Sequence, residues 1–360
     1  MNLREKIDNS PMGVYQWAIV LMAAVMNFLD GFDVLAIAFT ATNISKDFGL
    51  SKTEFGMLVS AGLIGMVVGS MVLAPLADKF GRRPILLLSV AFSAVGLAVS
   101  GFSTTSEILA FSRILTGLGV GGILVGTNVI TSEYSSKKWR SFAISVYAAG
   151  FGIGAMIGGI IAKSLQVAYS WHAVYFAGAT MTAVVFVVLW IWLPESIDYL
   201  NSKQPQNAKA RLNKIAHKLG FAGEWDLTSK AEKMAVKLPI WELFGKKYLR
   251  STLLLWLSFF AIMFCFYFIS SWTPALLKEA GMTMEESINV GMMISLGGAA
   301  GSLVYGLIAS RWSARSVLML FTVASSIAIV VFILSSANLA IAMVLGVVVG
   351  ALINGCISGL

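Results

Sequence analysis

Three ionisable side chains lie within long apolar runs of this chain. Asp30 and Asp33 belong to the first run and Arg113 to a later one. In the middle of a lipid bilayer each such charge costs about 2.5 to 3.5 kcal/mol, so residues of this kind are expected to serve a function. Asp30 and Asp33 are three residues apart and therefore share one face of a helix. This arrangement indicates proton transfer or the binding of a charged solute.

Asp33 and Arg113 are predicted to lie at the same depth in the bilayer. With a cytoplasmic N-terminus, the first run points outward and ends near Phe39, roughly 9 Å beyond Asp33. The fourth run points inward and begins near Ile108, at a similar distance from Arg113. We therefore expect Asp33 to pair with Arg113, and Asp30 to lie one helical turn deeper.

Two interpretations of this charged triad remain open. In the first, Asp30 or Asp33 takes up a proton, helped by burial that disfavours its charged form. Arg113 is then free to bind a carboxylate through two hydrogen bonds, and transport is coupled if proton and solute favour the same conformation. In the second, a permanent ion pair only locks two helices together. We favour the first, because a single aspartate would be enough for a lock.

The elements that carry the triad are predicted to be membrane-spanning helices. The chain is 58% hydrophobic and 12% charged, whereas soluble domains carry about 25% charged residues. Ten apolar runs are long enough to cross a hydrocarbon core of about 30 Å as helices, and they lack the alternation of barrel strands. They span approximately residues 17–39, 55–76, 85–102, 108–130, 142–162, 173–193, 252–272, 288–309, 317–334 and 339–360.

The positive charges indicate the orientation of these spans. With a cytoplasmic N-terminus, 21 Lys and Arg residues fall on the inner side and 4 in outer loops, with Arg113 inside a span. This asymmetry follows the positive-inside rule. It explains the net charge of +8 without nucleic acid as a partner. We expect a monomeric multi-pass protein of the bacterial inner membrane, with both termini in the cytoplasm.

No pattern in the chain predicts a cofactor. His172 and His217 have no second ligand at metal-binding spacing. Cys265 and Cys356 lie in apolar runs and are predicted to be buried thiols, not a disulfide. No glycine-rich stretch is followed by the Lys-Ser or Lys-Thr of a nucleotide-binding loop. We therefore expect neither an enzyme nor an ATP-driven pump, and no metal or other cofactor.

A polar segment divides the spans into two groups. Residues 1–193 contain six spans, residues 194–250 form a cytoplasmic central loop, and residues 251–360 contain four spans. Within the loop, basic residues from Lys203 to Lys218 are interspersed with Leu212, Ile215 and Leu219. This pattern predicts a short amphipathic helix on the inner surface of the membrane.

A sequence repeat relates the two groups. The segment Ala74-Pro-Leu-Ala-Asp78-Lys79-Phe-Gly81-Arg82-Arg83 follows the second span, and Gly306-Leu-Ile-Ala-Ser310-Arg311-Trp-Ser313-Ala-Arg315 follows the eighth. Transporters are often built from such repeats, with the solute site between them. The first segment resembles the signature loop of the major facilitator superfamily, and the second resembles a degenerate copy. The resemblance implies an all-α polytopic fold with six spans in each half, and therefore a chain truncated before its last two spans.

Four motifs resemble the aromatic acid:proton symporter family within that superfamily. They are Asp30-Gly31-Phe32-Asp33, the glycine-rich motif from Arg113 to Gly121, Glu133 with Arg140, and Leu193-Pro194-Glu195-Ser196. The last three also occur in sugar porters. The resemblance implies a secondary transporter that imports small organic anions with protons, such as benzoate, hydroxybenzoates or related unsaturated carboxylates. A sugar or polyol porter and a non-transporting membrane receptor are the alternatives.

The resemblance also implies a role for charged residues at the cytoplasmic ends of the spans. In the superfamily such groups form a network that closes the inner gate, and the matching residues here are Asp78, Arg82, Glu133 and Arg140. The alternative is that these charges only set the orientation of the spans. That explanation suits Arg83 but not Asp78, which is an acid among basic residues.

Aromatic and polar residues within the spans are further candidates for the solute site. Tyr267 and Phe264 in the seventh span could stack on an aromatic solute. Tyr147 in the fifth span and Asn354 in the tenth could bind its polar groups. Helix packing is the alternative for each of them. Together with the charged triad they complete the predicted site, whose partners would be a small carboxylate, protons and the surrounding lipid.

Overall fold

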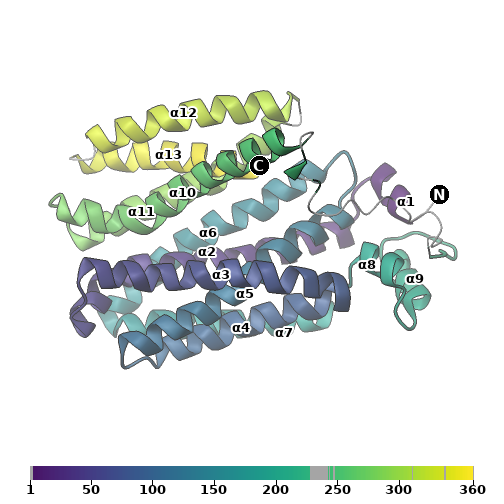
Figure 1. Cartoon of the computed structure of the whole chain (residues 1–360), viewed down its shortest axis with the longest axis horizontal. Coiled ribbons are helices and arrows are strands. Elements are labelled where there is room, and N and C mark those ends of the chain that lie inside the picture. Colours follow the sequence, from purple (N-terminus) through teal and green to yellow (C-terminus); the bar gives the residue numbers. More distant parts are fainter. Residues whose placement is uncertain are drawn as a thin grey trace.

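The chain forms helices and no strand within the residues that the computed structural model describes, which are 3–227, 242, 244–245, 248–309, 311–335 and 338–359. Most helices lie nearly parallel to the long axis of the molecule, in two layers (Figure 1). Their bounds are α1 Leu3–Asn9, α2 Val14–Phe48, α3 Lys52–Phe80, α4 Arg82–Gly101, α5 Ser106–Tyr134, α6 Arg140–Ala168, α7 Trp171–Trp192, α8 Ile197–Lys203, α9 Ala208–Lys218, α10 Leu249–Glu279, α11 Met284–Ala309, α12 Ala314–Ser335 and α13 Leu339–Gly359.

Ten helices of the described chain are long and apolar enough to cross a membrane, which confirms the predicted all-α fold with ten spans. The first span is longer than predicted, because α2 continues past Phe39 to Phe48. It ends at Gly49, whose φ of 64° lies in the left-handed region that favours glycine. Ser51 then begins α3 with a capping box, in which its hydroxyl accepts from the backbone N–H of Glu54.

Helices α2 to α7 pack together as a first group. Within it, α2 packs mainly on α6, while α5 packs on both α3 and α4. The approach of α2 and α6 is close, because a methyl group added at Gly31 or Gly154 would overlap a backbone carbonyl of the other helix. Small residues permit such close packing between membrane helices. The packing buries the side of α2 that carries Asp30 and Asp33.

Helices α10 to α13 form a second group, in which α13 packs on α11 and α12. The two groups meet chiefly where α6 packs against α11. Two ion pairs also join them near the C-terminal ends of α2 and α10: Lys52 to Glu279 at 2.8 Å and Lys163 to Glu285 at 2.5 Å. At the opposite end, no ion pair between described residues joins the groups.

Three short helices gather at that opposite end, on the right of Figure 1, where α8 and α9 lie near α1. Helix α9 coincides with the predicted amphipathic helix, and its Leu212, Ile215 and Ala216 are buried. These residues share an apolar cluster with Leu3 and Ile7 of α1. The apolar face of α9 is therefore covered by protein, so the prediction that it lies on the membrane surface is wrong. Of the predicted loop, repeat and last span, residues 228–241, 243, 246–247, 310 and 360 lie outside the described residues.

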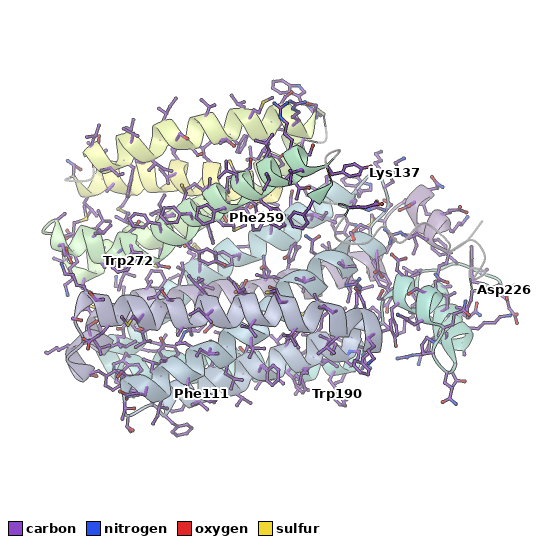
Figure 2. All side chains as sticks on the ribbon, viewed as in Figure 1. Phe111, Lys137, Trp190, Asp226, Phe259 and Trp272 are labelled. Atoms are coloured by element: carbon purple, nitrogen blue, oxygen red, sulfur yellow. The ribbon has the colours of Figure 1, made fainter. Side chains whose placement is uncertain are left out.

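The outer faces of the spans carry exposed apolar side chains, among them Phe111 and Trp190 (Figure 2). Exposed apolar surface of this kind suits contact with lipid tails, since every helix satisfies its own backbone. Cys265 lies on such a face of α10 and is exposed, so its prediction as a buried thiol is wrong. Cys356 is buried as predicted.

Candidate functional site

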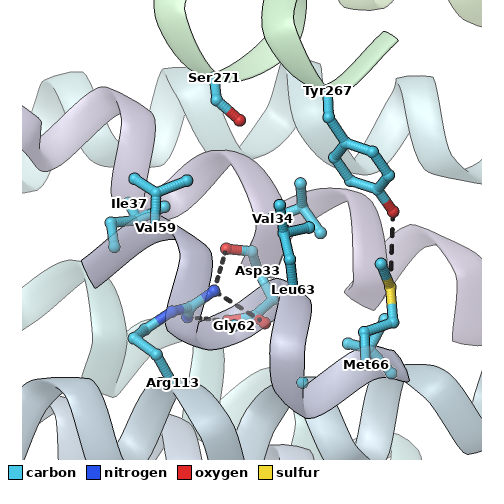
Figure 3. Close-up of a pocket in the computed structure, with 12 residues that line it drawn as sticks. Asp33, Val34, Ile37, Val59, Gly62, Leu63, Met66, Arg113, Tyr267 and Ser271 are labelled. Carbon is cyan, nitrogen blue, oxygen red and sulfur yellow. Dashed lines mark hydrogen bonds and ion pairs between the residues drawn. The ribbon is translucent and has the colours of Figure 1, made fainter. Parts of the chain in front are cut away.

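Asp33 of α2 and Arg113 of α5 form a buried ion pair between the spans (Figure 3). The Nη1 of Arg113 donates to Oδ1 of Asp33 at 2.6 Å, and its Nη2 lies 3.3 Å from both Oδ2 and the backbone oxygen of Asp33. The two side chains are only 5% and 3% exposed. The pairing predicted from equal depth is confirmed.

The close packing of α3 on α5 positions the guanidinium. Gly117 lies directly against the backbone of Gly62, where a side chain on Gly117 would overlap the carbonyl oxygen of Gly62. Gly62 itself lies beside Arg113, and a methyl group added there would be 3.7 Å from Nη2. The glycines therefore bring α3 close enough to form one wall around the ion pair.

Asp30 lies one turn before Asp33 in the same helix. It is 3% exposed, and its Oδ1 has no hydrogen-bond partner among the described residues. A buried carboxylate oxygen without a donor is costly, so a proton on Asp30 or a polar ligand nearby would relieve this cost.

A cavity opens beside the ion pair. Four of its lining residues are polar, namely Asp33, Arg113, Tyr267 and Ser271. The hydroxyl of Tyr267 points to the sulfur of Met66 at 3.4 Å (Figure 3). The remaining lining residues are apolar or glycine: Val34, Ile37, Val59, Gly62, Leu63, Gly117 and Val120. An apolar pocket with a few convergent polar groups is the usual form of a small-molecule site.

Not all predicted solute-binding residues line this cavity. Tyr267 does, whereas Phe264 is 61% exposed and stacks between Phe260 and Phe268 on another face of α10. Phe264 therefore does not accompany Tyr267, and its placement in the site is corrected. Asn354 packs against α11 at Gly298 and does not line this cavity.

Tyr147 also lies outside the cavity lining, in the interface between α2 and α6. Its backbone oxygen accepts a hydrogen bond from Asn27 at 3.0 Å. Tyr147 therefore lies where α6 packs against α2, the helix that carries Asp30. It is not placed to line the cavity.

The charged residues at the end near α8 form a network within the first group. Arg82 lies 3.0 Å from Asp78 and 3.6 Å from Glu133. Glu133 is 1% exposed and accepts hydrogen bonds from the hydroxyl of Ser196 at 2.9 Å and the backbone N–H of Ile197 at 3.0 Å. This network ties the start of α4 and the end of α5 to the start of α8.

Arg140 is not part of that network. It pairs instead with Asp8 of α1, and Arg4 of the same helix donates to the backbone oxygens of Ser132 and Glu133. Of the four expected gate residues, Asp78, Arg82 and Glu133 therefore share one network, whereas Arg140 contacts α1. Arg4 and Asp8 were missed because they precede the first span and contact residues more than 120 positions away.

Two further residues were missed by sequence reasoning. Glu195 accepts hydrogen bonds from the backbone N–H groups of Arg82 at 2.8 Å and Arg83 at 3.0 Å. The sequence motif that contains Glu195 did not predict these contacts. Ser271 lines the cavity, and its spacing of four residues from Tyr267 could have placed it on the same helix face.

Comparison with known proteins agrees with this architecture. Residues 22–360 match the family model of the Major Facilitator Superfamily. The gallate transporter of Pseudomonas putida is 32% identical over 314 residues, which cover 86% of this chain and 69% of that protein. The 4-hydroxybenzoate transporter PcaK of Pseudomonas putida is 30% identical over 364 residues, which cover 100% of this chain and 81% of that protein.

The fold is also similar to a solved structure. The xylose transporter XylE from E. coli, in a partially occluded inward open conformation, superposes with a TM-score of 0.75 at 16% identity, covering 96% of this chain and 83% of that chain. At this identity the likeness concerns the fold. The family match and the two relatives establish what the sequence motifs suggested: the chain is a multi-pass membrane protein that belongs to the major facilitator superfamily.

Proposed function

We propose that this protein imports small aromatic carboxylates together with protons. The observation that carries the proposal is the buried ion pair of Asp33 and Arg113 beside a small, mostly apolar cavity. A guanidinium is suited to bidentate binding of a carboxylate, and the apolar walls suit a ring. The relatives at 30% and 32% identity are named as transporters of 4-hydroxybenzoate and gallate, both of which are aromatic acids.

Coupling to protons follows from competition for Arg113. While Asp33 is ionised, it occupies the guanidinium and opposes a second carboxylate at the same place. Protonation of Asp33 weakens its ion pair with Arg113, and the carboxylate of the solute then binds Arg113 in place of Asp33. Asp30, whose Oδ1 lacks a partner among described residues, is the other acceptor of a proton in this scheme. Proton and solute thus favour binding of each other.

Movement of the two helix groups would carry the solute across the membrane. In this proposal residues 1–193 and 251–360 act as two bundles, linked by the central loop 194–250. The end with α1, α8 and α9 faces the cytoplasm, in keeping with its basic residues, and the protein acts as a monomer in the inner membrane. The ion pairs Lys52–Glu279 and Lys163–Glu285 would hold the outer end closed in this conformation.

The network at the cytoplasmic end would take part in the same movement. Asp78, Arg82 and Glu133 connect three segments at the inner ends of the spans. Arg140 contributes through Asp8, which ties α1 to α6. Rearrangement of these contacts would accompany opening and closing of the inner gate.

Uptake by membrane vesicles tests the proposal. Vesicles that contain the protein should accumulate labelled 4-hydroxybenzoate when an inward proton gradient is imposed, and a protonophore should abolish the accumulation. Labelled xylose, offered in parallel, should not accumulate. Accumulation of xylose without the acid would instead support the sugar porter. Saturable binding of the acid without any uptake would support the receptor.

A further inference from the structure

The polar groups of the cavity come from both helix groups. Asp33 and Arg113 belong to α2 and α5 of the first group, whereas Tyr267 and Ser271 belong to α10 of the second. Figure 3 shows the two α10 side chains on the opposite side of the cavity from Arg113, with the hydroxyl of Tyr267 pointing to Met66. A solute bound to Arg113 therefore meets α10 with its other end.

The hydroxyl of Ser271 differs from those of several other serines in the spans in its hydrogen bonding. Serine and threonine hydroxyls in apolar helices commonly bond to a carbonyl one turn earlier, as Ser258 does to Leu254 at 2.8 Å and Ser295 to Gly291 at 3.0 Å. Ser271 is only 7% exposed, yet it has no hydrogen bond within the described part of the chain. Because Ser271 lines the cavity, its hydroxyl is free to form a hydrogen bond with a solute there.

The hydroxyl of Tyr267 is only weakly engaged. Its contact is the thioether of Met66 at 3.4 Å, and sulfur of this type is a weak acceptor. Tyr267 and Ser271 are four residues apart and share one face of α10. The hydroxyl groups of Tyr267 and Ser271 thus both face the cavity. Either can form a hydrogen bond to an oxygen atom of a solute, and Tyr267 would do so in place of its contact with Met66.

We propose that Ser271 and Tyr267 determine specificity by binding a hydroxyl group on the ring of the transported acid. The inference rests on the proposed function, because it takes the carboxylate of the solute to lie on Arg113. The ring then lies among Val34, Val59 and Leu63, and its hydroxyl reaches α10.

This arrangement predicts discrimination between hydroxylated and plain aromatic acids. Benzoate would leave the hydroxyl of Ser271 without a partner in an apolar cavity, whereas 4-hydroxybenzoate would satisfy it. A hydrogen bond of ordinary net strength corresponds to roughly 3- to 10-fold in affinity. Because the solute then contacts both helix groups, the same bond also helps to close the groups around it.

The test compares uptake of 4-hydroxybenzoate and benzoate, each as kcat/KM, in vesicles with an inward proton gradient. The wild type should prefer 4-hydroxybenzoate. In Ser271→Ala the ratio of the two values should fall roughly 3- to 10-fold, and Tyr267→Phe should lower it in the same direction. Ser258→Ala, which removes a hydroxyl on an exposed part of the same helix, should leave the ratio unchanged.

Different failures have different meanings. If Ser271→Ala and Tyr267→Phe lower uptake of both acids equally, the residues support structure only and the specificity inference is overturned while aromatic acid transport stands. An unchanged ratio in both variants overturns the inference in the same way. If the wild type takes up neither acid, the proposed function itself fails, and the specificity inference fails with it.

Discussion

Arg113 lies 2.6 Å from a carboxylate oxygen of Asp33, but its Nε–H has no hydrogen-bond partner in the described chain. The charge of the guanidinium is thus balanced by Asp33, but one of its hydrogen-bond donors is unused. An incoming carboxylate finds a donor already held in position by packing, and it need only displace one competing carboxylate. In the proposed function, this unused donor capacity is available to the carboxylate of the solute.

Replacing Arg113 by Lys should lower uptake of 4-hydroxybenzoate at least tenfold. Lysine keeps the charge but cannot bind a carboxylate through two parallel hydrogen bonds. It would also leave Asp33 with a weaker partner in a buried position. Arg211→Lys on the exposed face of α9 is the matched control. Equal uptake by the two variants would mean that charge alone suffices at Arg113.

Substitutions at two glycines of α3 can distinguish effects on the cavity from effects on the stability of the fold. A methyl group at Gly62 meets Arg113 at 3.7 Å, an ordinary contact, whereas a methyl group at Gly65 overlaps the carbonyl oxygen of Ile114. Gly62→Ala should therefore fold normally but restrict the cavity, which should reduce uptake severalfold. Gly65→Ala should force α3 away from α5 and lower the thermal unfolding temperature of the purified protein. A greater loss of stability in Gly62→Ala would contradict this packing.

The ion pairs near the ends of α2 and α10 provide a test of movement. If they hold one end closed during only part of the cycle, fixing them should stop transport. Lys52→Cys with Glu279→Cys, joined by a short cleavable thiol cross-linker, should be inactive and should recover after reduction. Each single variant treated with the same reagent is the control. Continued transport by the cross-linked protein would show that this end need not open.

Glu133 and Asp78 should differ in their effects on stability. Glu133 is 1% exposed and Asp78 is 67% exposed, although both contact Arg82. Removing one partner of a buried ion pair costs about 3 to 5 kcal/mol, whereas an exposed pair contributes at most about 1 kcal/mol. Glu133→Ala should therefore lower the unfolding temperature clearly, and Asp78→Ala hardly at all. The reverse order in thermal unfolding would show that the network is held together from its exposed side.

Hydropathy and charge were sufficient to predict the spans, since each must be apolar over a bilayer thickness. They did not predict where helices end, because the continuation of α2 to Phe48 depends on local capping by Gly49. The pairing of Asp33 with Arg113 was nevertheless predictable. Two opposite charges that are buried in apolar helices have few other groups with which they could pair.

Residues whose role depends on helix rotation were harder to predict. Phe264 and Tyr267 are both aromatic and close in sequence, yet only Tyr267 lines the cavity. The seventh span is apolar on all sides, so its sequence does not show which face points inward. The contact of Arg140 with Asp8 was equally hard to predict, because it joins α1 to the start of α6, which is more than 120 residues away in the sequence.

The most direct test of the account measures proton-driven uptake in Asp30→Asn and Asp33→Asn. Vesicles containing each variant, with Asp226→Asn on the exposed surface as the control, are given labelled 4-hydroxybenzoate with and without an inward proton gradient. The account predicts that the gradient stimulates uptake in the wild type and the control, and that both triad variants lose this stimulation. Uptake that still rises with the gradient in both triad variants would contradict it.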